Sequence, residues 1–563
     1  MRTKLKLLFA IPLAIAALTI VPATHAQVTV KIVGAGSAAL WQEVALATAN
    51  APTLSGPKSH HWTTKSKCPD GSNCAQTYDV RTGVNHAEGG NLWVVWNNAQ
   101  TEVWAYISND AVVGNRAFFS APRAELQIDA NAENSGSGLN LIAFNLFKYG
   151  DQGNCGPGGG QEFTCDAPAL PSAIYTALNN ASINVAFSNL RPEDALFVQN
   201  RVNGALTNNL SGLGYTGTPL GIPVESTWDS STATPDVYAI SGTDPVTGDQ
   251  IPPYAVFDIG AAVETIAVNK KDASGLGSGI TDVSQSQLQA LFTGTTCNLS
   301  VFNGNPTIGV FPLLREPLAG EMNVFEFTNL TDPLSFVNSQ ETNVGQPTPG
   351  TSANPLNQQC LTGPGYRYRG IGTGEIVSGN GKGTGGILNI EDSIGYVAFS
   401  YGNVSPLAGS TSYGYLTLAG VDPLVGQPGY IQGEYPVCTA PCPATPGASF
   451  QHLRDGTYRS WAVLRAVTDS SGSNYTNLKA VVTAAQNNIN KYVPDFVPFK
   501  ASAGDPGLKL YRSHFTNVYT VGKANNGLGK KPENGGDVGG CIEPKGPPPG
   551  ILNKHENTGK CSL

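Results

Sequence analysis

Along most of this chain, short apolar segments typical of β-strands alternate with segments of helical periodicity. The predicted strands cover residues 183–188, 261–269, 308–314, 393–401 and 461–467. The predicted helices cover residues 37–50, 139–149, 171–180, 284–292, 320–330 and 477–490. A helix between two strands usually returns the chain parallel to the first strand, because the helix packs on one face of the sheet. The alternation therefore predicts an α/β fold with mostly parallel sheets flanked by helices.

The first 26 residues have the pattern of a cleaved secretory signal peptide. Three basic residues precede an apolar stretch at residues 7–21, and small residues lead to Ala26. A membrane anchor is the alternative, but the apolar stretch is short for a span. The chain has 66 glycines and only 13% charged residues, a balance typical of loop-rich secreted proteins. We therefore expect a periplasmic or extracellular protein.

Charge and catalytic motifs narrow the function. The net charge is −8 and no basic cluster is present, so nucleic acid is not expected as a partner. Neither a G-x-S-x-G nor an H-E-x-x-H motif occurs, and the seven histidines are scattered. We therefore expect a protein that is not an enzyme and that needs no metal or cofactor.

Ten cysteines in an exported chain favour disulfides. Their positions suggest pairing between sequential neighbours, each pair holding a loop. A metal site is the alternative, but the cysteines are scattered and histidine is scarce. The expected pairs are Cys68–Cys74, Cys155–Cys165, Cys297–Cys360, Cys438–Cys442 and Cys541–Cys561.

A glycine-rich turn, Gly34-Ala35-Gly36, follows the first apolar strand and leads into a predicted helix. Such turns bind anions, because the first N–H groups of a helix have no partner inside the helix. The stretch also fits a loose dinucleotide fingerprint, which requires an acidic residue about 20 positions further on. Residues 49–65 contain no Asp or Glu, so a dinucleotide is not expected.

Residues 92–107 read as a β-hairpin around Asn97-Asn98. The hairpin carries Trp93, Trp96 and Trp104. Such tryptophans usually fill a small core, and a sugar-stacking platform is the alternative. That alternative would make a neutral sugar the ligand.

Several stretches, in this order, resemble the phosphate-binding proteins of ABC importers, which have the type II periplasmic binding-protein fold. The opening VKIVGAGSAALW resembles that family's first strand and GAG turn, and NSGSG resembles its serine–glycine loop. INVAFSNLRPED is similar to its G-A-S-D-x-P segment, and AAVETIAVN to its crossover strand. ITDVSQSQLQALFTG, FPLLREPLAGEMNVFEF and SIGYVAFSYGNVSP match its later motifs.

The resemblance implies two lobes with the ligand in the cleft between them. Added to this frame are the tryptophan hairpin, the disulfide-stapled loops and a C-terminal tail. The expected division is a signal peptide at 1–26, lobe one at 27–262 and 405–510, lobe two at 263–404, and a loop-rich tail at 511–563.

The resemblance also implies a binding shell in lobe one. Backbone donors fall on Ala38 and Ala39, and the family's threonine hydroxyl is missing at Ala38, where Ser37 is a substitute. The serine of the glycine loop falls on Ser135, with Ser137 as an alternative. Both serines have the alternative of being ordinary loop residues.

Four further positions follow from the same resemblance. The family's aspartate falls on Asn189, whose alternative role is to cap a turn. Its arginine falls on Arg315, whose fork suits an oxyanion but which has the alternative of bridging Glu316 or Glu321. Its glycine falls on Gly320, and its threonine becomes Glu321, which would repel an anion unless paired, for example with Arg191.

Two functions remain open from the sequence. The first is an exported binding protein that captures a small, phosphate-like oxyanion and presents it to the membrane subunits of an ABC importer. The alternative is an extracellular structural or adhesion protein that keeps the fold with a degenerate site. The missing hydroxyls at Ala38 and Ala319, together with Glu321, motivate the alternative.

Overall fold

The computed structural model describes most of the chain between residues 27 and 508. The described residues are 27–49, 59–81, 87–133, 164–199, 237–330, 358–379, 385–437, 445, 447–489, 495–499, 504–508, 511–512 and 538–539, with single gaps at 168, 197, 317, 361 and 371.

Parallel strands form the centre of the first half. Strand β1 (Thr29–Gly36) lies between β6 (Glu102–Ser108) and β10 (Val185–Ser188) and is parallel to both. Beyond β6 the sheet continues through β5 (Asn91–Asn97), β2 (Ser59–Thr64) and β8 (Thr164–Asp166). Side chains alternate across β1, so that Ile32 and Val33 lie in two different hydrophobic clusters, one on each face of the sheet.

The second half repeats this plan. Strand β13 (Phe311–Arg315) lies between β15 (Tyr366–Gly370) and β16 (Ser393–Ala398) and is parallel to both. The edges are completed by β14 (Gln358–Gln359), β12 (Asp282–Val283) and β17 (Tyr413–Leu418).

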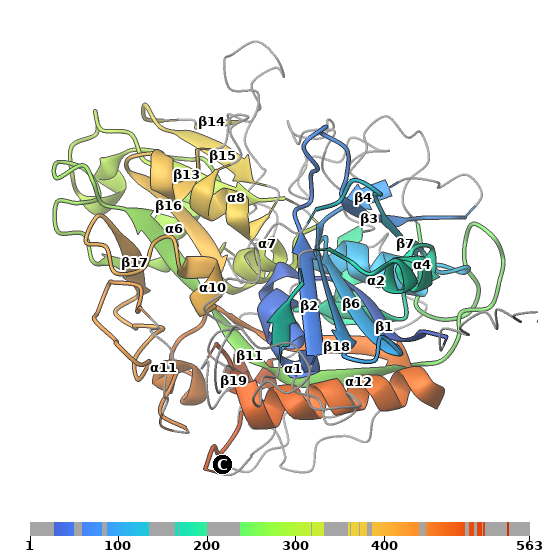
Figure 1. Cartoon of the computed structure of the whole chain (residues 1–563). Coiled ribbons are helices and arrows are strands. Elements are labelled where there is room, and N and C mark those ends of the chain that lie inside the picture. Colours follow the sequence, from blue (N-terminus) through green and yellow to red (C-terminus); the bar gives the residue numbers. More distant parts are fainter. Residues whose placement is uncertain are drawn as a thin grey trace, which may run out of the picture.

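One long strand joins the two halves. Strand β11 (Tyr254–Asn269) pairs along its first part with β18 (Trp461–Asp469), and along its last part with β16 and β17. Figure 1 shows this strand, in green, running from the first half of the molecule into the second. The two halves thus share one 15-stranded sheet.

Helices cover these sheets, as the alternating pattern predicts, and the predicted α/β class is confirmed. Helix α12 runs along one edge of the first half, and α7 lies between the halves (Figure 1). The helices are α1 (Trp41–Ala49), α2 (Ala111–Phe119), α4 (Ser172–Leu178), α6 (Gln285–Phe292), α7 (Gly320–Phe325), α8 (Thr373–Ser378), α9 (Gly386–Asn389), α10 (Tyr401–Val404), α11 (Gln451–Arg454) and α12 (Gly472–Ala484). No helix in the described ranges has both the length and the apolar character that crossing a membrane requires.

Among the predicted boundaries, the starts of two elements differ most from the structure. Strand β11 starts at Tyr254, not at residue 261, because residues 254–263 pair with β18. Helix α12 starts at Gly472, earlier than predicted, and continues as a π-helical turn (Ala485–Ile489). The predicted helix at 139–149 and most of the long segment before β11 lie outside the described residues. The residue limits of the two lobes remain predictions.

The tryptophan hairpin forms as predicted, from β5 and β6. Its tryptophans are at most 1% exposed, and the Trp93 indole N–H donates to the carbonyl of Trp41 at 3.0 Å. Their faces are therefore covered by the core, and the alternative of a sugar-stacking platform is wrong.

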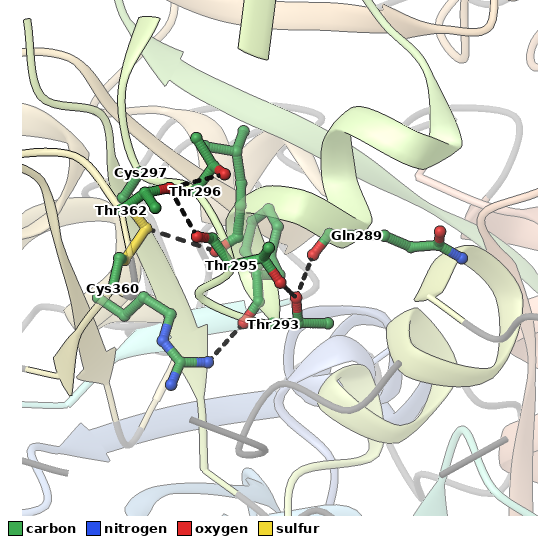
Figure 2. Close-up of a disulfide and its surroundings, with 10 residues drawn as sticks. Gln289, Thr293, Thr295, Thr296, Cys297, Cys360 and Thr362 are labelled. Carbon is green, nitrogen blue, oxygen red and sulfur yellow. Dashed lines mark hydrogen bonds between the residues drawn. A yellow bond between two sulfur atoms is a disulfide. The ribbon is translucent and has the colours of Figure 1, made fainter. Parts of the chain in front are cut away.

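Two of the five expected disulfides lie in the described residues, and both are present. Cys68–Cys74 closes a short loop, and Cys297–Cys360 joins residues 63 positions apart. Around the second disulfide, the Thr362 hydroxyl donates to the Thr295 carbonyl and to the Thr296 hydroxyl, both at 2.9 Å (Figure 2). This disulfide is buried, so it fixes packed segments and does more than staple a surface loop. The other three pairs lie outside the described residues, except for the backbone of Cys165 in β8.

A smaller four-stranded sheet packs on the first half. It contains β4 (Ala87–Gly89), β3 (Ala75–Tyr78), β7 (Glu125–Ile128) and β9 (Ala181–Ser182). Three strands of two residues each complete the fold: β19 (Val497–Pro498), which pairs with β11, and the pair β20 (Tyr511–Arg512) and β21 (Val538–Gly539).

Candidate functional site

The turn at the end of β1 is held rigidly. Gly36 has a φ of 142°, and a Cβ at this position would lie 1.9 Å from the carbonyl oxygen of Phe187, so only glycine fits. The amide of Ser37 donates to that carbonyl at 2.9 Å, and the Tyr106 hydroxyl donates to the carbonyl of Ser37. The buried Ser37 side chain is thereby fixed in place at the start of the 3-10 turn (Ala38–Leu40) before α1.

Arg315 ends β13 in the second half and is only 1% exposed. Its Nη2 donates to Asp110 Oδ1 at 2.8 Å, across the junction between the halves. Its Nη1 donates to the Thr373 hydroxyl at 2.9 Å. The backbone also crosses this junction, since the amide of Val112 donates to the carbonyl of Leu318 at 3.3 Å.

Glu321 lies between Arg315 and Ser37. Its Oε1 accepts from the Ser37 hydroxyl at 3.4 Å, and its Oε2 lies 3.5 Å from Arg315 Nη1. All three side chains are at most 1% exposed. The predicted convergence of Arg315 with the β1 turn therefore occurs, and the carboxylate of Glu321 fills the place between them. The alternative in which Arg315 bridges Glu316 or Glu321 is also confirmed, because Glu316 Oε1 lies 3.9 Å from its Nη2.

Three carboxyl groups thus surround one guanidinium. Burial raises the pKa of Glu316 well above its ordinary value, and the neighbouring Asp110 raises it further. Burial also raises the pKa of Asp110, although the hydrogen bond with Glu316 and the charge of Arg315 oppose this. Both raised pKa values favour the protonated form of the Glu316–Asp110 pair, and a proton there would lower the negative charge of this buried site.

Gly320 and Asn189 bring the halves into close contact. A Cβ on Gly320 would lie 1.7 Å from Asn189 Oδ1, so this position admits no larger residue without a shift. Asn189 is 3% exposed, and its Oδ1 accepts no hydrogen bond in the structure. An unsatisfied buried acceptor is unfavourable, so Asn189 is a position where a donor from a ligand would be stabilising.

The remaining predicted residues are placed as follows. The amide of Ala39 donates to the Ser37 hydroxyl at 3.3 Å, so the helix start is capped by the chain itself. Ala38 is partly exposed beside it. Arg191 pairs with Glu193 at 3.6 Å, whereas Glu321 pairs with Arg315. Ser135 and Ser137 lie outside the described residues.

Sequence reasoning missed Asp110 and Thr373. Asp110 follows the carboxyl end of β6, and its φ of 79° is rare for a residue other than glycine. Because β6 is parallel to β1 and Gly36 is in register with Ser108, the residues after both strands meet at one edge of the sheet. That topological rule would have singled out Asp110, but no signal in the sequence pointed to Thr373.

Chemically, this arrangement holds one oxyanion group between a hydroxyl and a guanidinium, in a site that excludes water. Arginine suits such a group, because its N–H donors are fixed in a fork that matches carboxylate and phosphate oxygens. In the structure that oxyanion group is the protein's own Glu321 carboxylate.

No protein-family model and no curated protein sequence matches the chain. In structure, the chain is similar to phosphate-binding proteins of ABC importers, the family that its motifs resemble. One is a putative phosphate ABC transporter substrate-binding protein with bound phosphate from Clostridium perfringens (16% identity, 43% of this chain, 71% of that chain, TM-score 0.25). Another is a phosphate-binding protein from Stenotrophomonas maltophilia (14% identity, 61% of this chain, 82% of that chain, TM-score 0.28). At such identities and TM-scores, function has to be argued from this chain's own residues.

Proposed function

We propose that this protein is an exported binding protein that captures a small, phosphate-like oxyanion between its two lobes. In this proposal it is not an enzyme, and it delivers the anion to the membrane subunits of an ABC importer. The two disulfides support an oxidising location, in the periplasm or outside the cell.

One observation carries the proposal. Ser37 from the first half and Arg315 from the second contact the two oxygens of a single carboxylate. A site that binds one oxyanion group from both sides closes when that group is present, which is the property a two-lobed capture protein needs. Asn189, Gly320 and Glu321 lie at the same junction, and Ser135 and Ser137 remain proposed members of the shell.

Calorimetric titration of the purified protein with phosphate, sulfate and small carboxylates tests the proposal. We expect binding of at least one of these anions and a loss of at least about 30-fold in Arg315→Ala, because the main positive charge is removed. Arg315→Lys keeps the charge without the fork, and we expect it to fold and to bind more weakly. No heat with any anion, in protein with native circular dichroism, would contradict the proposal.

Arg454→Ala is the matched control. Arg454 is also largely buried and also pairs with a carboxylate, Asp505, at 2.9 Å, but it belongs to α11, which Figure 1 shows apart from α7. We expect it to lower stability while leaving anion affinity unchanged. Equal losses of affinity in both variants would assign the effect of Arg315→Ala to folding and not to binding.

The excess of buried carboxyl groups supports a second candidate, an extracellular structural protein with a degenerate site. There, Glu321 would join the halves permanently and no anion would bind. The same titration separates the two candidates.

A further inference from the structure

We infer that Glu321 is a tethered competitor of the ligand: its carboxylate occupies the oxyanion site, and the anion binds by displacing it. The inference rests on the proposed function and adds a built-in regulator of affinity to it. It is carried by the lengths of the contacts around Arg315 and by the way α7 is held.

Glu321 is held more loosely in this site than Asp110, which lies 2.8 Å from Arg315 Nη2. Its contacts to Ser37 and Arg315 are 3.4 Å and 3.5 Å, and its Oε2 accepts no hydrogen bond. Charge-assisted hydrogen bonds of good geometry are about 2.7–2.9 Å long. A free oxyanion that approaches to that distance therefore gains more than the Glu321 carboxylate loses when it leaves.

Arg315 stays neutralised during such an exchange. Its short bonds to Asp110 and Thr373, 2.8 Å and 2.9 Å, do not involve Glu321. The exchange thus replaces one carboxylate by another oxyanion at nearly constant charge, apart from the second charge of a dianion. This avoids leaving a buried guanidinium unpaired, which would be strongly unfavourable.

In this closed arrangement of the halves the backbone at Glu321 is tightly packed, so the exchange of one oxyanion group for the other needs a movement of the Glu321 side chain alone. Gly320, the first residue of α7, is packed against Asn189 so closely that it has no room for a Cβ. The Glu321 side chain therefore rotates while its backbone stays packed. Its effective concentration at the site is high because it belongs to the same chain. A competitor of this kind sets a threshold: the protein loads only when the free anion is concentrated enough to displace it.

Removing the competing charge tests the inference. We expect Glu321→Gln to bind phosphate about tenfold more tightly than the wild type, within the usual range of coupling between two linked equilibria. The matched control is Glu326→Gln, a buried glutamate in the turn that follows α7, and it should bind like the wild type. Thermal unfolding gives a second readout: without anion Glu321→Gln should melt at a lower temperature than the wild type, and phosphate should raise its Tm more.

The outcomes separate this inference from the proposed function. Tighter binding in Glu321→Gln alone supports both. Equal affinities in the wild type and Glu321→Gln overturn the competitor role and leave oxyanion binding standing. No binding of any tested anion in either protein, with both folded, overturns the proposed function and this inference with it.

Discussion

Two buried arginines in this protein are held in very different ways. Arg81, in the first half, forms a two-pronged ion pair with Asp79, with contacts of 2.8 Å and 3.1 Å. Its Nη1 donates to Asp244 at 2.9 Å and to the carbonyl of Val237 at 2.7 Å. Asp244 also accepts from the amides of Ala121 and Val246.

Arg315 is equally buried, but its three carboxyl partners lie at distances from 2.8 Å to 3.9 Å. The pKa values differ in direction too. At Asp244, burial is outweighed by hydrogen bonds and by Arg81, so the pKa is lowered. At Asp110, burial prevails and the pKa is raised. The contacts of Arg81 to its carboxylates are short, whereas those of Arg315 to Glu316 and Glu321 are longer, as the proposed exchange of Glu321 for an anion requires.

The largest expected effect is on the well-saturated cluster. Arg81→Ala leaves Asp79 and Asp244 buried without their guanidinium, and we expect it to lower the free energy of unfolding by about 3–5 kcal/mol. Urea unfolding measures this change. The anion affinity of the folded fraction should stay at the wild-type value. A specific loss of affinity would show that Arg81 also supports anion binding, against the distinction drawn between the two arginines.

Next, the two clusters should respond oppositely to pH. Because the folded-state pKa of Glu316 is raised, folded protein holds a proton that unfolded protein loses above about pH 4.5, and stability falls as pH rises. In Glu316→Gln this loss of stability with rising pH should be absent. Its free energy of unfolding should therefore rise relative to that of the wild type, by at most about 1.4 kcal/mol for each pH unit. Because the pKa of Asp244 is lowered, its contribution to the free energy of unfolding is instead lost as pH falls below about 3.8. The difference in stability between Asp244→Asn and the wild type should therefore be smallest in acid.

Unfolding curves from about pH 3 to about pH 9 measure both variants. A Glu316→Gln curve parallel to the wild type would show that this carboxyl is not the protonated member of its pair. A curve for Asp244→Asn that is parallel to the wild-type curve would show that the pKa of Asp244 is not lowered. The two clusters would then not differ in the direction of their pKa shifts.

The smallest effect is expected at Ser37. Ser37→Ala deletes the hydroxyl that contacts Glu321 and also the cap of the Ala39 amide. We expect anion affinity to fall about tenfold and stability by about 1 kcal/mol. Titration calorimetry and urea unfolding measure the two. Affinity unchanged beside the stability loss would make Ser37 a structural cap only.

How far the sequence predicts the site depends on the kind of signal. The β1 turn was found because glycine spacing is a local pattern, and Arg315 because its stretch resembles a motif of the phosphate-binding proteins. Asp110 was missed because it follows a hairpin strand whose neighbour in the sheet is more than 60 residues away along the chain. The pairing of Glu321 with Arg315, not with Arg191, was left open, because the sequence does not say which of two arginines lies nearer.

By itself, the sequence determined the order of strands and helices, the α/β class and two disulfide pairs, since periodicity and spacing act over short distances along the chain. Only the tertiary structure decided that the tryptophans are core and that Glu321 fills the oxyanion site. Burial and contact across the junction depend on residues far apart in the chain, and the energies of charged groups depend on how far each is removed from water.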